Sequence, residues 1–253
     1  KTIGGFDLDA NLKYNLSGTL TGNLFDATAS YAINENNRVR FSLHTSSRMP
    51  NFNYLLYQSE YLNYNWDNSE RFDKERVSSL KAEFSSSKWG NLMVKYTNLD
   101  NYTYFSPVSD SPILNDNENA FIRQLQENSG ISYLKVKYEK EFKVGMFALN
   151  NTVMYQNVTQ DNNVLNLPQL VTRNTFYFAS DVFKKAMYLQ TGITFKYFTS
   201  YTMNGYNPVL GEFFVQNSEK LGAYPLLDFF INGRIKQTRI YLKAEHFNSS
   251  FTG

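Results

Sequence analysis

The stretch FDLDANLKYNLS, residues 6–17, alternates apolar and polar side chains for twelve residues without interruption. Phe6 and Leu8 begin its apolar side, and Asp7 and Asp9 begin its polar side. Successive side chains of a β-strand point to opposite faces, so this pattern predicts a strand with one apolar and one polar face. Which face meets water decides between a soluble β-protein and a wall that separates lipid from an aqueous space.

The same alternation recurs along the whole chain, and no stretch has the periodicity of an amphipathic helix. We therefore expect an all-β protein with about eleven strands. They are predicted near residues 6–17, 23–33, 39–46, 76–85, 91–102, 130–142, 146–158, 171–183, 187–199, 225–236 and 239–248.

The predicted connections alternate between short and long. The short ones fall near 34–37, 85–90, 142–145, 184–186 and 236–238, and the long ones near 47–72, 103–129, 159–170 and 200–223. Bacterial outer-membrane barrels have short periplasmic turns and long extracellular loops. The pattern favours a transmembrane antiparallel up-and-down β-barrel, with the short turns on one rim.

Composition narrows the class further. The 253 residues carry a net charge of +2, so no strong field favours nucleic acid, and without cysteine a disulfide framework is excluded. The longest apolar clusters, such as GMFAL and LLDFF, are far shorter than the ~18–20 residues of a membrane helix. Aromatic residues make up 17% of the chain.

Alternation alone also fits a soluble, lipocalin-like barrel with an apolar interior. The strands, however, exceed the soluble mode of about five or six residues. Phe6 and Tyr14, like Phe147 and Tyr155, are eight positions apart on the apolar side, about 26 Å at ~3.3 Å per residue. Strand tilt reduces this to roughly 20 Å, close to the ~25 Å lipid band with its aromatic girdles. These four residues are thus predicted to form a lipid-facing girdle.

The polar side carries many charged residues, as a wet interior permits. We predict that these residues line a lumen, and that their basic excess of about three gives only a weak anion preference, because salt screens opposite walls. The predicted lumen-lining residues are Lys13, Arg40, His44, Lys81, Glu83, Lys95, Lys135, Lys137, Glu139, Lys196, Asp228, Arg234, Lys243 and Glu245.

The chain has two histidines, His44 and His246. An outer-membrane lipase would need Ser, His and an orienting Asn or Asp in mutual reach, and Ser42 and Ser46 lie close to His44 in sequence. We interpret His44 as lumen lining and His246 as a strand-end residue on the apolar side. Two distant histidines without cysteine do not form a metal-ligand set. No catalytic residue, metal or cofactor is expected.

Two loops offer other chemistry. NDNEN, residues 115–119, with Asp110 nearby, carries oxygen ligands suited to calcium, but it lacks EF-hand spacing and is interpreted as a solvated loop. The first long loop carries an aromatic cluster with interspersed Asn. Such residues suit either packing within the loop or contact with sugar rings. The cluster consists of Tyr54, Tyr57, Tyr61, Tyr64 and Trp66.

Residues 207–248, NPVLGEFFVQNSEKLGAYPLLDFFINGRIKQTRIYLKAEHFN, resemble the C-terminal region of the putative porin family of Bacteroidota outer membranes. SSRMPNFNYLLYQSEYLNYNW (46–66) and LPQLVTRNTFYFASDVFKKAMYLQTGI (167–193) are similar to that family too. The resemblance implies a porin in the bacterial outer membrane. Members of the family usually continue into an aromatic last strand, and they begin with a region that this sequence lacks. We therefore expect residues 1–253 to be part of one larger, even-numbered barrel.

Four functions remain open from the sequence. The first is a porin-like diffusion channel for small hydrophilic solutes, and the second is a non-conducting structural or docking barrel subunit of a larger assembly. An outer-membrane enzyme and a soluble carbohydrate-binding β-protein are the others. The expected partners are outer-membrane lipid, small hydrophilic solutes and other envelope proteins, but not nucleic acid.

Overall fold

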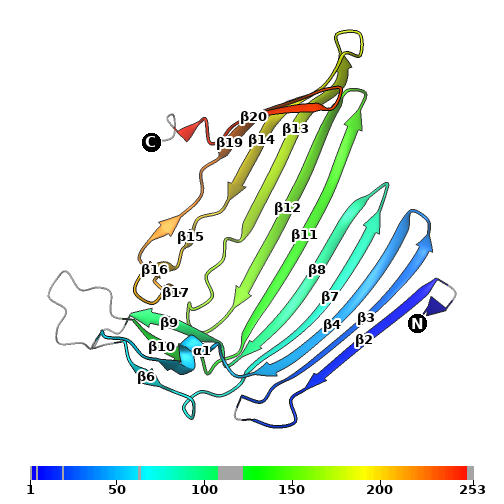
Figure 1. The fold of residues 1–253 in the computed structure, drawn as a ribbon. Helices are drawn as coiled ribbons and strands as arrows, with labels where there is room; N and C mark the ends of the chain where they lie inside the picture. The colour runs from blue at the N-terminus through cyan, green and yellow to red at the C-terminus, as the bar shows by residue number, and fades with distance from the viewer. Residues whose placement is uncertain (1, 4, 19, 62–63, 108–121, 250–253) are drawn as a thin grey trace.

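The computed structural model describes residues 2–249 except 4, 19, 62–63 and 108–121, and its main feature is one large antiparallel sheet (Figure 1). Within the described residues this sheet has twelve strands that follow one another up and down, and β1 contributes only two residues to it. The expected count of about eleven strands is confirmed by the eleven longer ones. In sheet order, the strands are β1 (Thr2–Ile3), β2 (Phe6–Tyr14), β3 (Asn23–Asn34), β4 (Asn37–Arg48), β7 (Glu75–Ser86), β8 (Gly90–Asp100), β11 (Ile131–Val144), β12 (Phe147–Thr159), β13 (Leu170–Val182), β14 (Met187–Phe198), β19 (Leu226–Ile235) and β20 (Thr238–Ala244).

Short and long connections separate to the two ends of the sheet, as predicted. The tight turns after β3, β7, β11, β13 and β19 lie at one end, and the long connections lie at the other (Figure 1). Lys184 and Lys185 adopt positive φ in the turn after β13, and so does Lys236 in the turn after β19. Positive φ at central turn residues gives a hairpin a twist that matches its strands.

Two predicted strands end early. The first ends at Tyr14, and Leu16 lies beyond it with 91% of its surface exposed. The last ends at Ala244 and not near residue 248, because the following backbone turns back toward β19: the Phe247 N–H donates to the Leu227 carbonyl over 3.0 Å. The alternation of apolar and polar residues continues past the ends of both strands, so it does not indicate where either strand stops.

Three of the long connections fold into a small structure that we call the loop cap. It contains the four-stranded sheet β10-β9-β17-β16, the two-stranded sheet β5-β6 and the short helix α1. None of these elements was predicted. Their bounds are α1 (Phe52–Leu55), β5 (Leu56–Tyr57), β6 (Trp66–Asp67), β9 (Thr103–Pro107), β10 (Ile122–Gln126), β16 (Gly205–Asn207) and β17 (Glu212–Phe214); a further pair, β15 (Tyr201–Thr202) and β18 (Lys220–Leu221), lies between the cap and the main sheet in the chain.

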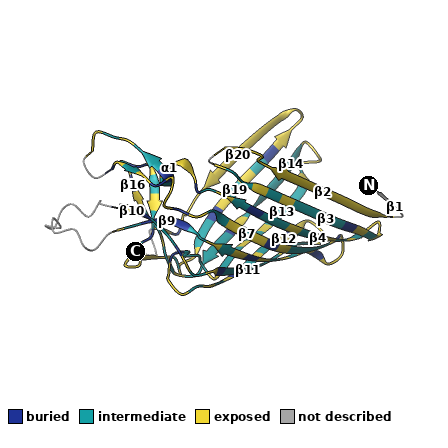
Figure 2. Cartoon of the chain, turned by 90° about the horizontal axis from the view of Figure 1, so that it is seen from below, coloured by how far each residue is buried: buried dark blue, intermediate teal, exposed yellow. Residues whose placement is uncertain are grey.

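Burial is distributed in an unusual way. Of the four most deeply buried apolar side chains, Leu55, Phe105 and Ile122 belong to the cap, and Ile131 begins β11 of the main sheet. The apolar face of the main sheet is instead open, with Leu12 exposed by 72% and Leu80 by 57% (Figure 2). A soluble protein buries such a face against a second layer. A contiguous exposed apolar face of this extent indicates a surface made for lipid.

The main sheet is not closed. Among the described residues, β2 and β20 are its first and last long strands, and they are not paired with each other. No described helix is long and apolar enough to cross a membrane, since α1 has four residues.

Candidate functional site

The candidate functional site is the polar face of the main sheet, the face that carries Lys13, Lys135 and Asp228. Directly paired residues of antiparallel strands point to the same side, so the register from β2 to β20 decides which side chains share this face. Thirteen of the fourteen predicted lumen residues lie on it: Lys13, Arg40, His44, Lys81, Glu83, Lys95, Lys135, Lys137, Glu139, Lys196, Asp228, Arg234 and Lys243.

Glu245, the fourteenth, follows the end of β20 and forms an ion pair with Lys243. The shared face agrees with the predicted grouping. That these residues line an aqueous lumen stays a prediction.

The four predicted girdle residues lie on the opposite, apolar face. Phe6 and Phe147 lie toward the short-turn end of their strands, and Tyr14 and Tyr155 lie toward the long-loop end. The two pairs are therefore placed as two separate belts would require, and all four side chains are exposed. Their contact with lipid interfaces stays a prediction.

Charges on the polar face pair along individual strands. Lys81 Nζ lies 3.1 Å from Glu83 Oε2, and Lys137 Nζ lies 2.8 Å from Glu139 Oε1. Residues two positions apart share a face, so each pair forms within one strand. Exposed pairs of this kind contribute only about 0–1 kcal/mol to stability. Their main effect is to balance local charge on the wall.

Between some neighbouring strands, like charges are register partners. Lys81 on β7 is the register partner of Lys95 on β8, and Lys95 is the partner of Lys135 on β11. On β13 and β14, Arg173 is the partner of Lys196. Adjacent strands lie about 4.8 Å apart, so these residues form short basic rows on the polar face. Sequence reasoning compared charges along each strand and missed these rows, which depend on the register.

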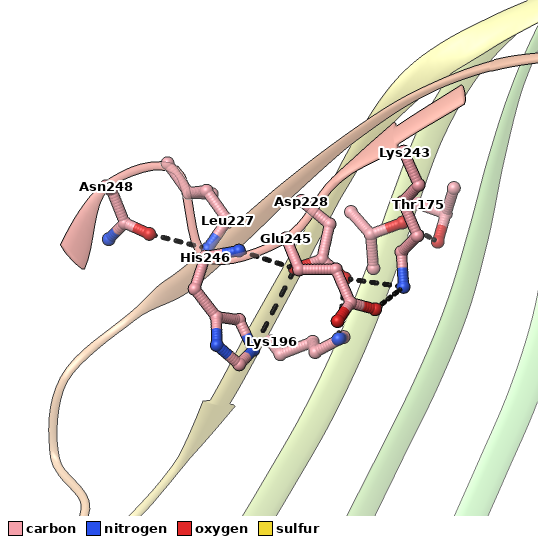
Figure 3. A network of polar contacts seen from close by, with 9 residues as sticks. Thr175, Lys196, Leu227, Asp228, Lys243, Glu245, His246 and Asn248 are labelled. Atoms are coloured by element: carbon pink, nitrogen blue, oxygen red, sulfur yellow. Dashed lines mark hydrogen bonds and ion pairs between the residues drawn. The ribbon is translucent and has the colours of Figure 1, made fainter.

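Asp228 forms the most buried polar contact on this face. Its side chain is 1% exposed, and its Oδ2 lies 2.6 Å from Lys196 Nζ and 3.4 Å from Lys243 Nζ (Figure 3). The backbone N–H of His246 donates to Oδ1 over 3.1 Å. A carboxylate removed from water requires such partners, since a buried unpaired charge costs several kcal/mol. Asp228 thus joins β14, β19 and β20 and holds the chain that follows β20.

This contact corrects the interpretation of His246. The alternation predicted it at a strand end on the apolar side, but β20 ends at Ala244 and His246 has a positive φ of 49°. Its ring turns toward Asp228, with Nε2 4.0 Å from Oδ1 (Figure 3). The reason is local: Asp228 accepts from the His246 backbone, and this bond takes the place of further pairing with β19.

His44 stands between two partners on the polar face. Its Nδ1 lies 2.7 Å from Asp26 Oδ1, and its Nε2 lies 3.2 Å from Ser46 Oγ. The order Asp–His–Ser is that of a hydrolase triad. Catalysis also needs donors for the oxyanion, and β4 pairs with β3 and β7 along this stretch, so its N–H groups point to neighbouring strands. Asp26, His44 and Ser46 thus form a hydrogen-bonded polar network on the strand surface, and that it has no catalytic role stays a prediction.

The loop cap lies over the long-loop end of the polar face. At this end the sheet face that is polar elsewhere carries the apolar residues Leu99, Ile131 and Val158. These residues belong to one apolar cluster with Val164 and Val215, which come from two of the long connections. In addition, the Val215 N–H donates to the Phe105 carbonyl over 2.7 Å. The cap is thus attached to the inner rim of the sheet by a small apolar cluster.

The predicted aromatic cluster forms part of the cap core. Tyr54 stacks on Phe105 with ring centroids 4.6 Å apart, and Tyr57 stacks on Trp66 at 4.9 Å. Tyr64 is buried as well, whereas Tyr61 is exposed. Packing within the loops, one of the two alternatives, is confirmed for these buried rings. Burial, reinforced by nearby Tyr102, Glu212 and Glu75, raises the pKa of Tyr54 well above its usual value of 10.0.

The candidate calcium segment, residues 115–119 with Asp110, lies outside the described residues. Within the part of the chain that the structure describes, no three His, Cys, Asp or Glu side chains come together as metal ligands.

The sequence model of one family, described as "Putative porin", matches residues 1–253. The chain belongs to the putative porin family. The expected family is confirmed at this level, and no curated protein matches this porin-family chain in sequence.

Solved structures show the fold of this porin. A ferric enterobactin receptor in complex with BCV-L6 has a TM-score of 0.63 at 13% identity, covering 98% of this chain and 38% of that receptor. A mutant of the ferric enterobactin receptor from Pseudomonas aeruginosa, in complex with enterobactin, has a TM-score of 0.61 at 12% identity, with the same coverage. The porin chain spans less than two fifths of the length of these receptors.

Together, family and fold place this porin in the bacterial outer membrane, as an antiparallel β-barrel protein. They also agree with the exposed apolar face, which a soluble carbohydrate-binding protein would not leave uncovered. At 12–13% identity the likeness carries the fold and no ligand.

Proposed function

We propose that this chain forms part of the wall of a diffusion channel for small hydrophilic solutes in the outer membrane, with a weak preference for anions. One observation carries the proposal: the long strands of the sheet have an apolar face and a polar face, and most of their charged residues lie on the second. The exceptions, Arg76, Asp100 and Lys140, lie toward the ends of their strands. A wall with lipid on one side and water on the other requires this division.

The basic rows support the anion preference. Three lysines in direct register, Lys81, Lys95 and Lys135, concentrate positive charge at one height of the wall. Nearby Glu83 and Glu139 keep that charge from dominating the whole face. With a Debye length of about 8 Å at physiological salt, the preference should be mild and should fall as salt rises.

Planar-bilayer recordings of the native protein test this proposal. We expect steady ohmic conductance and a reversal potential on the anion side under a salt gradient, smaller at high salt. Clear cation selectivity would contradict the proposed wall. A complete lack of conductance from correctly folded protein would favour the second candidate.

That second candidate is a non-conducting structural or docking barrel subunit of a larger envelope assembly. The loop cap favours it, because Val215, directly after β17, packs onto the polar face at Ile131 together with Val164 of the connection after β12. A cap fixed there narrows the long-loop mouth. Replacing Val215 by a polar residue should raise the conductance if the cap constricts the channel. The conductance should stay absent if another partner fills the barrel.

The remaining expectations belong to the same proposal. The partners are outer-membrane lipid, small hydrophilic solutes and other envelope proteins, and the source is a Bacteroidota outer membrane, in line with the resemblance of residues 46–66, 167–193 and 207–248. We propose no enzymatic activity. We also propose at least one further strand outside these residues, because the unpaired edge of β20 and the edge of β2 beyond its short pairing with β1 would be costly in lipid.

A further inference from the structure

A cavity of about 490 Å³ opens at the long-loop end of the sheet, between the connection after β12 and the connection after β14. Half of its fourteen lining residues are Asn or Gln, and Tyr201 adds an aromatic ring. Lys220 is the one charged residue among them. The volume is within the ~300–1,000 Å³ range of small-molecule sites. We call this cavity the amide groove.

Hydrogen bonds between the two connections hold the groove in shape. Asn166 Nδ2 donates to Asn217 Oδ1 over 3.1 Å, and Asn217 Nδ2 donates to the Asn163 carbonyl over 3.4 Å. Gln160 closes the first connection on itself, because its Oε1 accepts from the Leu165 N–H over 3.0 Å and its Nε2 donates to the Leu165 carbonyl over 3.1 Å. These bonds fix the amide groups before any ligand binds, which lowers the entropic cost of binding.

The apolar cluster beneath the loop cap also holds the floor of the groove in place. Leu165 is both a lining residue and part of the apolar cluster that attaches the cap to the sheet. Val164, its neighbour, is 4% exposed in that cluster. The connection after β12 is therefore held at two points, by buried side chains below and by amide bonds at its side. Its conformation is therefore fixed by contacts on two sides.

The groove's chemistry selects for hydroxyl groups. An amide side chain offers both a donor and an acceptor, and a hydroxyl needs both, whereas a charged ligand would meet no counter-charge except Lys220. Asn163 and Thr202 also line the groove, and their side-chain polar groups form no hydrogen bond with another described residue, so these groups are available to a ligand. The ring of Tyr201 can pack against the apolar face of a sugar.

We infer that the amide groove binds a neutral carbohydrate. Long connections are on the extracellular side of outer-membrane barrels, so the sugar comes from outside the cell. It is either a free oligosaccharide or the glycan of a surface lipid, which share this chemistry. Binding here does not depend on whether the barrel conducts, so this inference goes beyond the channel proposal.

Binding of detergent-solubilised native protein to a panel of immobilised neutral and acidic oligosaccharides tests the inference. We expect retention on at least one neutral glycan and weaker retention on acidic ones. The double variant Asn163→Ala/Thr202→Val should weaken binding to that glycan by about tenfold or more, since it removes two ligand-facing polar groups. Asn36→Ala, in the tight turn after β3, should bind like the wild type.

Equal thermal unfolding of the three proteins shows that the variants fold. Competition with purified lipopolysaccharide and with its delipidated sugar then identifies the source. If the natural ligand is the glycan of a surface lipid, both competitors should displace the protein from the immobilised glycan. If the natural ligand is a free oligosaccharide, neither competitor should displace it. The inference is overturned if wild-type protein retains no neutral glycan, or if the double variant binds as tightly as the wild type.

Discussion

Lys95 of β8 lies directly opposite Lys81 of β7 in the main sheet. Lys135 of β11 lies on its other side, so Lys95 is the centre of a row of three lysines on the polar face. Like charges that face one another across strands are destabilising. Glu83 relieves part of this repulsion through Lys81, and water on the polar face is needed to screen the remainder.

The row makes Lys95 the position at which selectivity should be most sensitive. Lys95→Glu places a carboxylate between Lys81 and Lys135, and we expect the reversal potential under a salt gradient to move toward the cation side. Lys13→Glu is the matched control, because it makes the same change of charge on β2, away from the row. Equal shifts for both variants would show that total charge, and not the row, sets the preference.

The two faces predict opposite responses to charge on β11. Val136→Arg should destabilise the protein by ~2–4 kcal/mol near the bilayer midplane, while Lys135→Gln should cost little. Val136 pairs with Val94 and Tyr155 on the apolar face, and Lys135 pairs with Lys95 on the polar face. Urea unfolding in lipid vesicles measures both. Similar losses at these neighbouring positions would argue against the assignment of faces.

Asp228 should matter far more than its charged neighbours. Asp228→Asn removes the buried charge that pairs with Lys196 and Lys243, and we expect a loss of about 3 kcal/mol. Glu245→Gln breaks an exposed pair with Lys243 and should change the stability little. Unfolding in denaturant compares the two. A small effect of Asp228→Asn would mean that the two lysines find other partners.

The cap should loosen in alkali. The pKa of Tyr54 is raised by burial, so its contribution to stability is complete below pH 10 and is lost as the pH rises through the raised value. Limited proteolysis of the connection that holds Tyr54 should therefore become faster above pH 10. Tyr54→Phe keeps the stack on Phe105 but cannot ionise, so its proteolysis should depend less on pH. If the pH dependence of proteolysis is the same in Tyr54→Phe, the ionisation that loosens the cap belongs to another group, for example Tyr102, whose pKa is also raised by burial.

His44 should not support hydrolysis. Purified protein is expected to leave ester and phospholipid substrates intact, and Ser46→Ala should alter neither this result nor ion conductance. Hydrolysis by the wild type that is lost in both Ser46→Ala and His44→Ala would instead make Asp26, His44 and Ser46 a working triad.

Alternation was sufficient to predict the main sheet, because a period of two is a local property and the strands are long. It could not predict the basic row at Lys81, Lys95 and Lys135, since the row depends on how neighbouring strands align. The register in turn depends on turn lengths and on an irregularity between Ala32 and Asn34 in β3. Sequence spacing alone contains none of this.

The cap was missed for a different reason. Its strands have two to five residues, too short for a period to be recognised, and they pair across different connections: Phe214 of β17 is the partner of Phe105 of β9. The aromatic cluster did indicate packing in the first long loop, but not that Phe105 and Ile122 complete its core. The amide groove likewise combines two connections that lie far apart in the sequence.

Cysteine labelling tests most directly whether the polar face meets water and the apolar face meets lipid. The chain has no cysteine, so single cysteines can be introduced without background. In intact vesicles, Lys135→Cys should react quickly with a small water-soluble maleimide, and Val136→Cys should react slowly until detergent or denaturant exposes it. Equal labelling at the two positions, or faster labelling at residue 136, would contradict the division of the sheet into a lipid face and a water face.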